Sequence, residues 1–411
     1  MTPTSHAWNP IETSFGYRYR ATITRPSWAG LLGQPVFPIC LFSPKDSDAI
    51  YVGSGSHRTF MPSEMRFLET TDPMFLSMRY ESSDGPSGVI PEYLVHITAS
   101  ATTLDIYSDH PMPAAVCDAA YQTLFSNQED PIIRLAHQKD LPTHDDWVLA
   151  VLTAQREMEH GALEKIVLSR TSAFTRLSGQ GGSGLYAGFA EQLTQNGYHY
   201  FYKNDAYTLM GHSPEALLRV RGEAVSVDVV AGTRLSRAQG SLLNSPKDLA
   251  EHAVVLAYVQ RVLSHYGPIQ NSPRIEMDLG ALTHLYQCVE ASVPMAYLGE
   301  LIQALHPTPA LCGFPKQTAK QLIADLEQSS RGWYGGGFGM SIGDTLDLAV
   351  TIRGLHLTEA ACTAQVGAGI VAASDPIQEW HELNTKLQSV VAQLGDVSQG
   401  YPRFEKPADG Q

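Results

Sequence analysis

Two kinds of hydrophobic pattern divide the chain. Up to about residue 140, short runs in which every second residue is apolar, such as YRYRATITR and YLVHITAS, are separated by turns rich in proline and glycine. This pattern is typical of half-buried strands. After residue 140, longer segments with a helical period of about 3.6 residues appear among apolar runs rich in branched residues.

The second pattern predicts helices at 143–160, 186–197, 246–266, 294–305, 315–327 and 375–394. It also predicts strands at 163–170, 199–204, 206–211, 215–220, 224–232, 334–341, 346–357 and 362–372. Strands and helices occur in blocks as well as in alternation, which fits a doubly wound parallel sheet poorly. We therefore predict an α+β fold, with residues 1–411 forming one large domain.

The last predicted helix carries charged residues beside its apolar stripe. Glu379, Glu382 and Lys386 follow at i, i+3 and i+7, so they lie together on the flank of that stripe. The helix that begins near Pro246 likewise places Asp248 and Glu251 on one face. A solvated face with an ordinary Glu–Lys pair would explain this spacing. Carboxylates that share a hard cation such as Mg²⁺, with an amine beside them for an anion, are the alternative, and the second acidic helix face favours it.

A glycine-rich segment precedes the last helix. Gly367 and Gly369, in VGAGIVAASDP, predict a turn or strand whose backbone N–H groups meet an anion. A tight turn or close strand packing without a ligand would explain them as well. The run GGGFG at 335–339 lacks the spacing and the strand-to-helix context of a dinucleotide site.

Composition narrows the range of partners. The 411 residues carry a formal net charge of −14 with no clustered Lys or Arg, which argues against nucleic acid, although a few pocket cations could still hold a small anion. Five scattered cysteines predict reduced thiols, and no apolar run approaches the ~18 residues of a membrane span. The N-terminal segment lacks the pattern of a secretory signal. We therefore expect a cytoplasmic protein that binds neither membrane nor nucleic acid.

Ten segments resemble, in the same order, those of the chorismate-utilising enzymes, a family that includes isochorismate synthase, salicylate synthase, the large component of anthranilate synthase and aminodeoxychorismate synthase. The segments are KIVLSR, SPEALL, VAGTR, KDLAEH, LTHL, LHPTPALCGFP, RGWYGGGFG, AVTIRG, GAGIVAASDP and EWHELNTK. The resemblance covers residues 150–395, whereas residues 1–145 correspond to a variable half of the fold and 396–411 to a flexible tail. It implies two β-sheets flanked by helices around a central cleft, with chorismate as substrate. A core of this size permits a monomer, which we expect.

The resemblance also implies an Mg²⁺ site. Glu251 and Glu382 are similar to the residues that bind the ion in the family, with Glu379 close by or acting through water. Lys386 resembles a residue that contacts a substrate carboxylate.

Four further positions resemble the family's substrate-binding residues. Arg353 and Gly367 correspond to the site of the enolpyruvyl carboxylate, and Gly232 and Thr233 to groups that line the ring.

The remaining positions indicate which reaction to expect. Lys165 resembles the lysine that acts as general base on water, and burial near a cation would lower its pKa as that role requires. Glu215 resembles the general acid that protonates the departing C4 hydroxyl, and an apolar pocket would keep it protonated. Ala231 replaces the nucleophilic lysine of aminodeoxychorismate synthases. Ala310 stands where members that eliminate pyruvate carry threonine or serine.

We therefore expect an Mg²⁺-dependent isochorismate synthase, an isomerase of the hydroxymutase type, that serves siderophore, menaquinone or other secondary metabolism. A salicylate synthase is the nearest alternative, because it forms isochorismate and then eliminates pyruvate. An ammonia-dependent aminodeoxyisochorismate or anthranilate synthase comes third, and a non-catalytic chorismate-binding protein is the alternative from another class.

Overall fold

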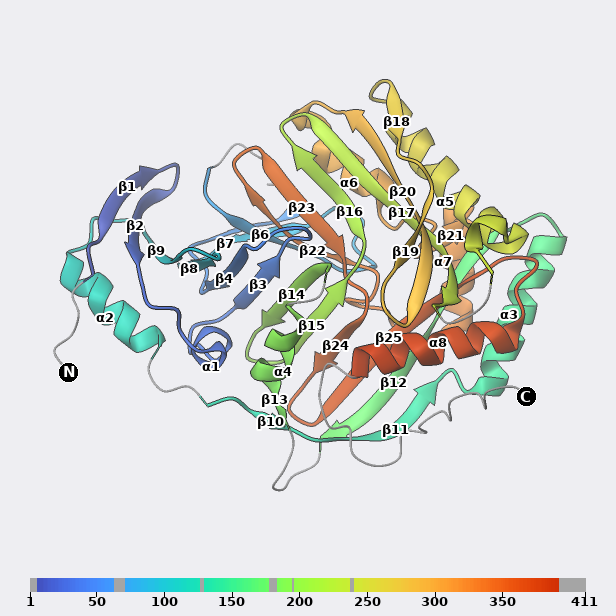
Figure 1. Ribbon diagram of the computed structural model, residues 1–411, viewed down its shortest axis with the longest axis horizontal. Helices are drawn as coiled ribbons and strands as arrows, with labels where there is room; N and C mark the ends of the chain where they lie inside the picture. The colour runs from blue at the N-terminus through green and yellow to red at the C-terminus, as the bar shows by residue number, and fades with distance from the viewer. Residues whose placement is uncertain are drawn as a thin grey trace.

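The computed structural model describes residues 6–62, 71–125, 129–176, 183–193, 196–236 and 240–391. The predicted flexible tail at 396–411 lies outside these ranges. Two large antiparallel sheets with helices packed against them dominate the described part of the chain (Figure 1). This arrangement confirms the predicted α+β class.

The larger sheet has 13 strands, and β21 (Gly313–Phe314) pairs with β12 beside the main path. The order along that path is β1 (Asn9–Thr13), β2 (Gly16–Thr22), β9 (Thr102–Ser108), β8 (Tyr93–Ile97), β4 (Ile50–Ser54), β3 (Ile39–Ser43), β14 (Tyr198–Lys203), β15 (Thr208–Ser213), β24 (Gly354–Leu357), β25 (Ala361–Ile370), β12 (Lys165–Arg176) and β11 (Leu135–Leu141).

The smaller sheet has 10 strands, and β19 (Ile275–Asp278) pairs with β20 beside the main path. Its order is β18 (Ile269–Asn271), β20 (Leu282–Ser292), β17 (Ala224–Leu235), β16 (Ala216–Arg221), β23 (Thr345–Val350), β22 (Gly337–Ile342), β6 (Met74–Met78), β7 (Ser87–Ile90) and β5 (Arg58–Phe60). Strands β10 (Ile132–Ile133) and β13 (Ser183–Gly184) form a separate pair. The N-terminal part of the chain thus contributes strands to both large sheets.

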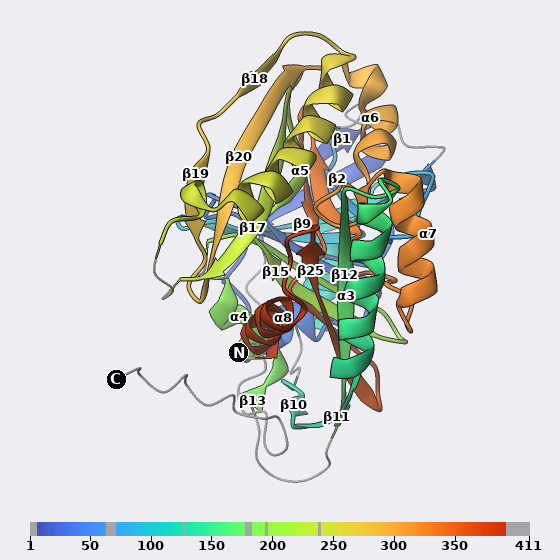
Figure 2. The same ribbon diagram turned by 90° about the vertical axis from the view of Figure 1, so that its right-hand side faces the viewer.

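The six predicted helices are all present. They are α3 (His144–Glu159), α4 (Leu185–Gln192), α5 (Pro246–Ser264), α6 (Leu298–Leu305), α7 (Lys316–Leu326) and α8 (Pro376–Val391). The structure also contains α1 (Trp28–Leu32) and α2 (Ala114–Leu124), which were not predicted. Helix α5 starts where expected, because the Ser245 side chain caps it by accepting from the Asp248 backbone N–H. It packs along β17 and β20, whereas α8 packs on β25 and against α3 (Figure 2). None of the helices in the described ranges is long and apolar enough to cross a membrane.

One strand prediction is wrong, and the difference shapes the cleft. Residues 346–357 form two strands, β23 in the smaller sheet and β24 in the larger, instead of one. The chain crosses between the sheets at 351–353, where Arg353 has a positive φ of 52°. A non-glycine residue rarely adopts this conformation, so the surrounding packing must hold it in place. The crossover carries Arg353 to the space between the sheets.

Candidate active site

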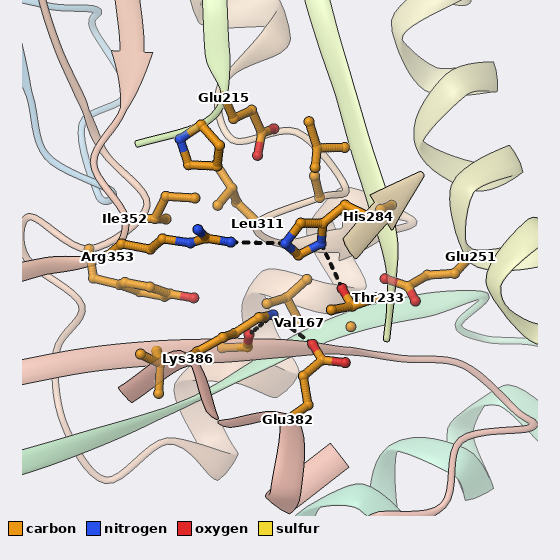
Figure 3. Close-up of a pocket in the computed structure, with 18 residues that line it drawn as sticks. Val167, Glu215, Thr233, Glu251, His284, Leu311, Ile352, Arg353, Glu382 and Lys386 are labelled. Atoms are coloured by element: carbon orange, nitrogen blue, oxygen red, sulfur yellow. Dashed lines mark hydrogen bonds and ion pairs between the residues drawn. The ribbon is translucent and has the colours of Figure 1, made fainter. Parts of the chain in front are cut away.

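A cavity lies between the two sheets, with an empty volume of about 670 Å³ that includes the solvent at its mouth. Residues from both sheets, from α5 and α8 and from connecting loops form its wall (Figure 3): Val167, Pro214, Glu215, Val230, Ala231, Thr233, Glu251, His284, Ala310, Leu311, Tyr334, Ile352, Arg353, Val366, Gly367, Gly369, Glu382 and Lys386.

Most of the predicted site residues meet at this cavity. Eight of them form part of its wall: Glu215, Thr233, Glu251, Ala310, Arg353, Gly367, Glu382 and Lys386. Three others, Lys165, Gly232 and Glu379, lie behind that wall. Gly232 has a φ of 79° at a bulge in β17, and it turns the neighbouring Thr233 toward the cavity while packing against Asp248.

Lys165 is the first residue of β12 and is only 1% exposed. Its Nζ lies 3.1 Å from Oε1 of Glu251, which reaches across from α5. Burial alone would raise the pKa of Glu251, but the positive charges of Lys165 and Lys247 lower it below the usual value. The predicted base is therefore held beside a carboxylate that remains ionised.

Gly369 makes room for this ion pair. An added Cβ at this position would lie 2.1 Å from Oε1 of Glu251 and 3.1 Å from Cε of Lys165. At Gly367, an added Cβ would lie 2.2 Å from the Tyr334 hydroxyl. Both glycines belong to β25 and pair with β12, so of the turn and the strand that the sequence left open, the strand is found. The space above each glycine is filled by closely packed side chains.

The acidic flank of α8 is not a solvated face. Glu379 is 2% exposed, and the Glu382 side chain is 13% exposed. Lys386 Nζ lies 2.6 Å from Oε1 of Glu382 and donates to the backbone oxygen of Gly367 at 2.8 Å. Burial and the neighbouring charge of Glu382 raise the pKa of Glu379 to about 7 although Lys247 Nζ lies 2.6 Å from its Oε1. In this arrangement each of these carboxylates faces a lysine.

The lysine contacts of these carboxylates limit which of them could bind the predicted metal ion. Within the described ranges, no three carboxylate, imidazole or thiol groups lie close enough together to form a ready-made metal cage. Glu379 pairs with Lys247 outside the cavity wall, near enough to Glu382 and Glu251 for their charges to act on it. Glu251 and Glu382 do share the cavity wall. One or two carboxylates completed by water and substrate oxygens are the usual protein contribution to Mg²⁺ binding, so the oxygen donors present fit this ion.

Arg353, His284 and Thr233 form a chain of hydrogen bonds along the cavity (Figure 3). Arginine can only donate, so His284 Nε2 must accept from Nη2 of Arg353 at 2.9 Å. His284 is therefore neutral, and its Nδ1–H donates to Oγ1 of Thr233 at 2.9 Å. Burial and the charge of Arg353 agree with this, because they hold the pKa of His284 well below its usual value. The Thr233 hydroxyl is thereby set to donate its own hydrogen to an oxygen in the cavity.

His284 has no role in the sequence-based assignment. A histidine inside an apolar strand is more often a core residue than a functional one, and only its contacts with Arg353 and Thr233 reveal its place.

Glu215 enters the cavity from the connection between β15 and β16 (Figure 3). Its backbone N–H donates to Ser213 Oγ at 3.3 Å, and its backbone oxygen accepts from Val350 N at 3.1 Å. Burial and the negative charge of Asp228 raise the pKa of the Glu215 carboxyl to about 8. At neutral pH the cavity therefore contains a carboxylic acid able to donate a proton, together with cations suited to an anionic ligand.

The two-sheet fold and this cavity, with its buried acid, are those of an enzyme that acts on a small anion, and the chain belongs to the family described as chorismate binding enzyme, whose model matches residues 89–395. It is 24% identical over 412 residues to isochorismate synthase MenF of Haemophilus influenzae, covering 94% of each protein. It is 32% identical over 282 residues to isochorismate synthase DhbC of Bacillus subtilis, covering 63% of this chain and 70% of that protein.

Solved structures confirm the fold. The structure of MenF, the menaquinone-specific isochorismate synthase from Escherichia coli, matches with a TM-score of 0.79 at 21% identity and covers 95% of this chain and 96% of that one.

Proposed function

We propose that this protein is an isochorismate synthase, which converts chorismate to isochorismate. The observation that carries the proposal is a buried, protonated glutamic acid in the cavity together with a buried lysine directly behind the cavity wall. Glu251 of α5 and Glu215 reach the cavity from different sides (Figure 3), and Glu251 holds Lys165 behind the wall. Water addition at one ring carbon with loss of hydroxide from another requires one base and one acid at separate positions.

The proposed reaction exchanges one water for another. Once the Lys165 ammonium that pairs with Glu251 has released its proton, the neutral amine accepts a proton from a water whose oxygen bonds to C2 of chorismate. The ring double bonds shift, the bond between C4 and its hydroxyl breaks, and Glu215 protonates the departing hydroxyl to water. Return of the proton from Lys165 to the Glu215 carboxylate restores both groups.

The cavity cations hold the substrate in this orientation. Arg353 and Lys386 supply positive charge for the two carboxylates of chorismate, and Thr233 offers its hydroxyl hydrogen to a substrate oxygen. Mg²⁺ held by Glu251 and Glu382 would supply further positive charge for a substrate carboxylate and would compete with Lys165 for Glu251. Ala231, also in the cavity wall, offers no amine to attack the ring.

A product assay tests the proposal. The purified protein is incubated with chorismate and Mg²⁺, with and without ammonium, and the products are separated by chromatography. We expect isochorismate alone in both samples. Salicylate with an equal amount of pyruvate would assign the salicylate synthase reaction instead, and a product that requires ammonium would assign an amine-forming one. No turnover at all would favour a protein that only binds chorismate.

Removal of the metal is expected to lower the rate by about 100-fold or more, because a bound cation contributes several kcal/mol of charge stabilisation. The measurement compares initial rates in EDTA with rates after Mg²⁺ is added back in excess. Full activity in EDTA, after dialysis against the chelator, would contradict the Mg²⁺ site.

Replacing Gly369 by alanine is expected to lower kcat/KM about 10- to 100-fold while the protein still folds. The added methyl group would take the place of the Glu251 carboxylate, from which it would be only 2.1 Å away. That carboxylate ends a flexible side chain and can move, but it then loses Lys165. Gly337→Ala is the matched control, because its Cβ would meet Leu348 and Met78 at 3.2 and 3.3 Å and does not face the cavity. Equal kinetic losses in both variants would argue against a special role for Gly369.

A further inference from the structure

The strand that follows Glu215 begins irregularly. The register of β16 against β23 shifts between Ala216 and Leu218, as at a β-bulge. On its other side, the pairing of β16 with β17 runs only from Arg219 to Arg221. The start of β16 therefore diverges from β17 directly after the proposed acid. Bulges of this kind redirect a side chain, here that of Glu215.

A carboxylate bridges the divergence. Asp228 of β17 is 1% exposed, and its Oδ2 accepts from the backbone N–H of Ala216 at 2.9 Å. Its Oδ1 accepts from Nη2 of Arg219 and from the Tyr286 hydroxyl, both at 2.9 Å. Three donors from two other strands thus converge on one buried carboxylate. The Ala216 bond substitutes for the backbone hydrogen bond that β17 would otherwise provide.

The same carboxylate also acts on Glu215 through its charge. The groups that bear on the Glu215 carboxyl come from several elements: Asp228 from β17, Lys165 from β12, Lys386 from α8 and Arg353 from the crossover between the sheets. The three cations favour the ionised form of Glu215, and Asp228 opposes it together with burial. Arg219 and Tyr286 in turn hold Asp228 in place.

We propose that Asp228 is a positioning residue for the general acid: it fixes the bulge that aims Glu215 into the cavity, and its negative charge keeps that carboxyl protonated. The catalytic half of this statement rests on the proposed function. The structural and electrostatic half does not, because it concerns the Glu215 carboxyl whatever the reaction is.

The test is Asp228→Asn. The amide offers one oxygen where the carboxylate offers two, so either Ala216 or Arg219 loses its acceptor, and the negative charge is gone. We expect kcat to fall and its decline at alkaline pH to move to lower pH by about one unit. Tyr286→Phe is the near control, because it removes one hydrogen bond to Asp228 and leaves the charge and the Ala216 bond. Its alkaline decline is expected to stay in place.

Infrared spectroscopy can follow the absorption band of the protonated Glu215 carboxyl as pH is raised, and the loss of this band in Glu215→Gln assigns it. This titration gives the pH at which Glu215 ionises without any turnover. If wild-type protein makes no isochorismate, the function fails but the titration still decides the role of Asp228. A Glu215 transition that stays in place in folded Asp228→Asn would overturn the proposal. If that variant does not fold, Arg219→Gln takes its place as the test. Without the positive charge of Arg219, the negative charge of Asp228 acts more strongly on Glu215, so the transition should move to higher pH. An unchanged or lowered transition in Arg219→Gln would contradict the proposal.

Discussion

Replacing Lys165 by methionine is expected to lower kcat by about 10²- to 10⁴-fold, the usual contribution of a general base. Methionine keeps much of the side-chain length but cannot accept a proton from water. The change also leaves Glu251 without its nearest cation in a buried position, 3.1 Å from the former amine. Removing one partner of a buried ion pair typically costs ~3–5 kcal/mol, so this variant should also unfold more easily.

Lys165→Arg separates the two effects. The guanidinium retains a positive charge beside Glu251 but does not give up its proton near neutral pH. We expect thermal stability closer to that of wild type than in Lys165→Met, with a loss of kcat nearly as large. Steady-state kinetics and thermal unfolding on the three proteins measure this. If Lys165→Arg keeps half of the wild-type kcat, the lysine serves as a charge and not as a base.

The local elements of the fold could be predicted because their signals are local. The cap at Ser245 and the 3.6-residue apolar period of α8 depend only on neighbouring residues, and both helices are found at the expected places. The switch from β23 to β24 could not be predicted this way. Apolar and polar residues largely alternate along 346–357, as they would in one strand. Only the pairing with distant partners, β16 for β23 and β15 for β24, divides the segment between two sheets.

The site was predictable in its residue types but not in its pairing. Carboxylates at helical spacing indicated a shared task for Glu379 and Glu382, yet the spacing could not show that Glu379 turns to Lys247 while Glu382 meets Lys386. It also could not show that Lys165 lies behind the cavity wall beside Glu251. These contacts join segments far apart in the chain, so they arise only when the two sheets and the helices pack together.

Replacing Glu215 by glutamine is expected to lower kcat by about 10²- to 10⁴-fold with a much smaller change in KM. The two side chains have nearly the same shape, so binding is retained while the proton donor is lost. In wild type the carboxyl has a pKa of about 8 and acts in its protonated form, so its ionisation should make kcat fall above that pH. The residual activity of the variant should lack this alkaline decline. A decline at the same pH in Glu215→Gln would assign it to another group.

The pH dependence of the stability against unfolding gives an independent check of the pKa of the Glu215 carboxyl. Its pKa is about 8 in the folded protein against an ordinary value of 4.5, so the folded state binds more protons between these limits. The stability that this group contributes is therefore full below pH 4.5 and is lost as pH rises toward and through 8. Glutamine does not titrate, so the variant should gain stability relative to wild type as pH increases from 5 to 8. Thermal unfolding across this range measures the difference, and a constant difference would show that Glu215 is ionised throughout, which would remove it as the acid.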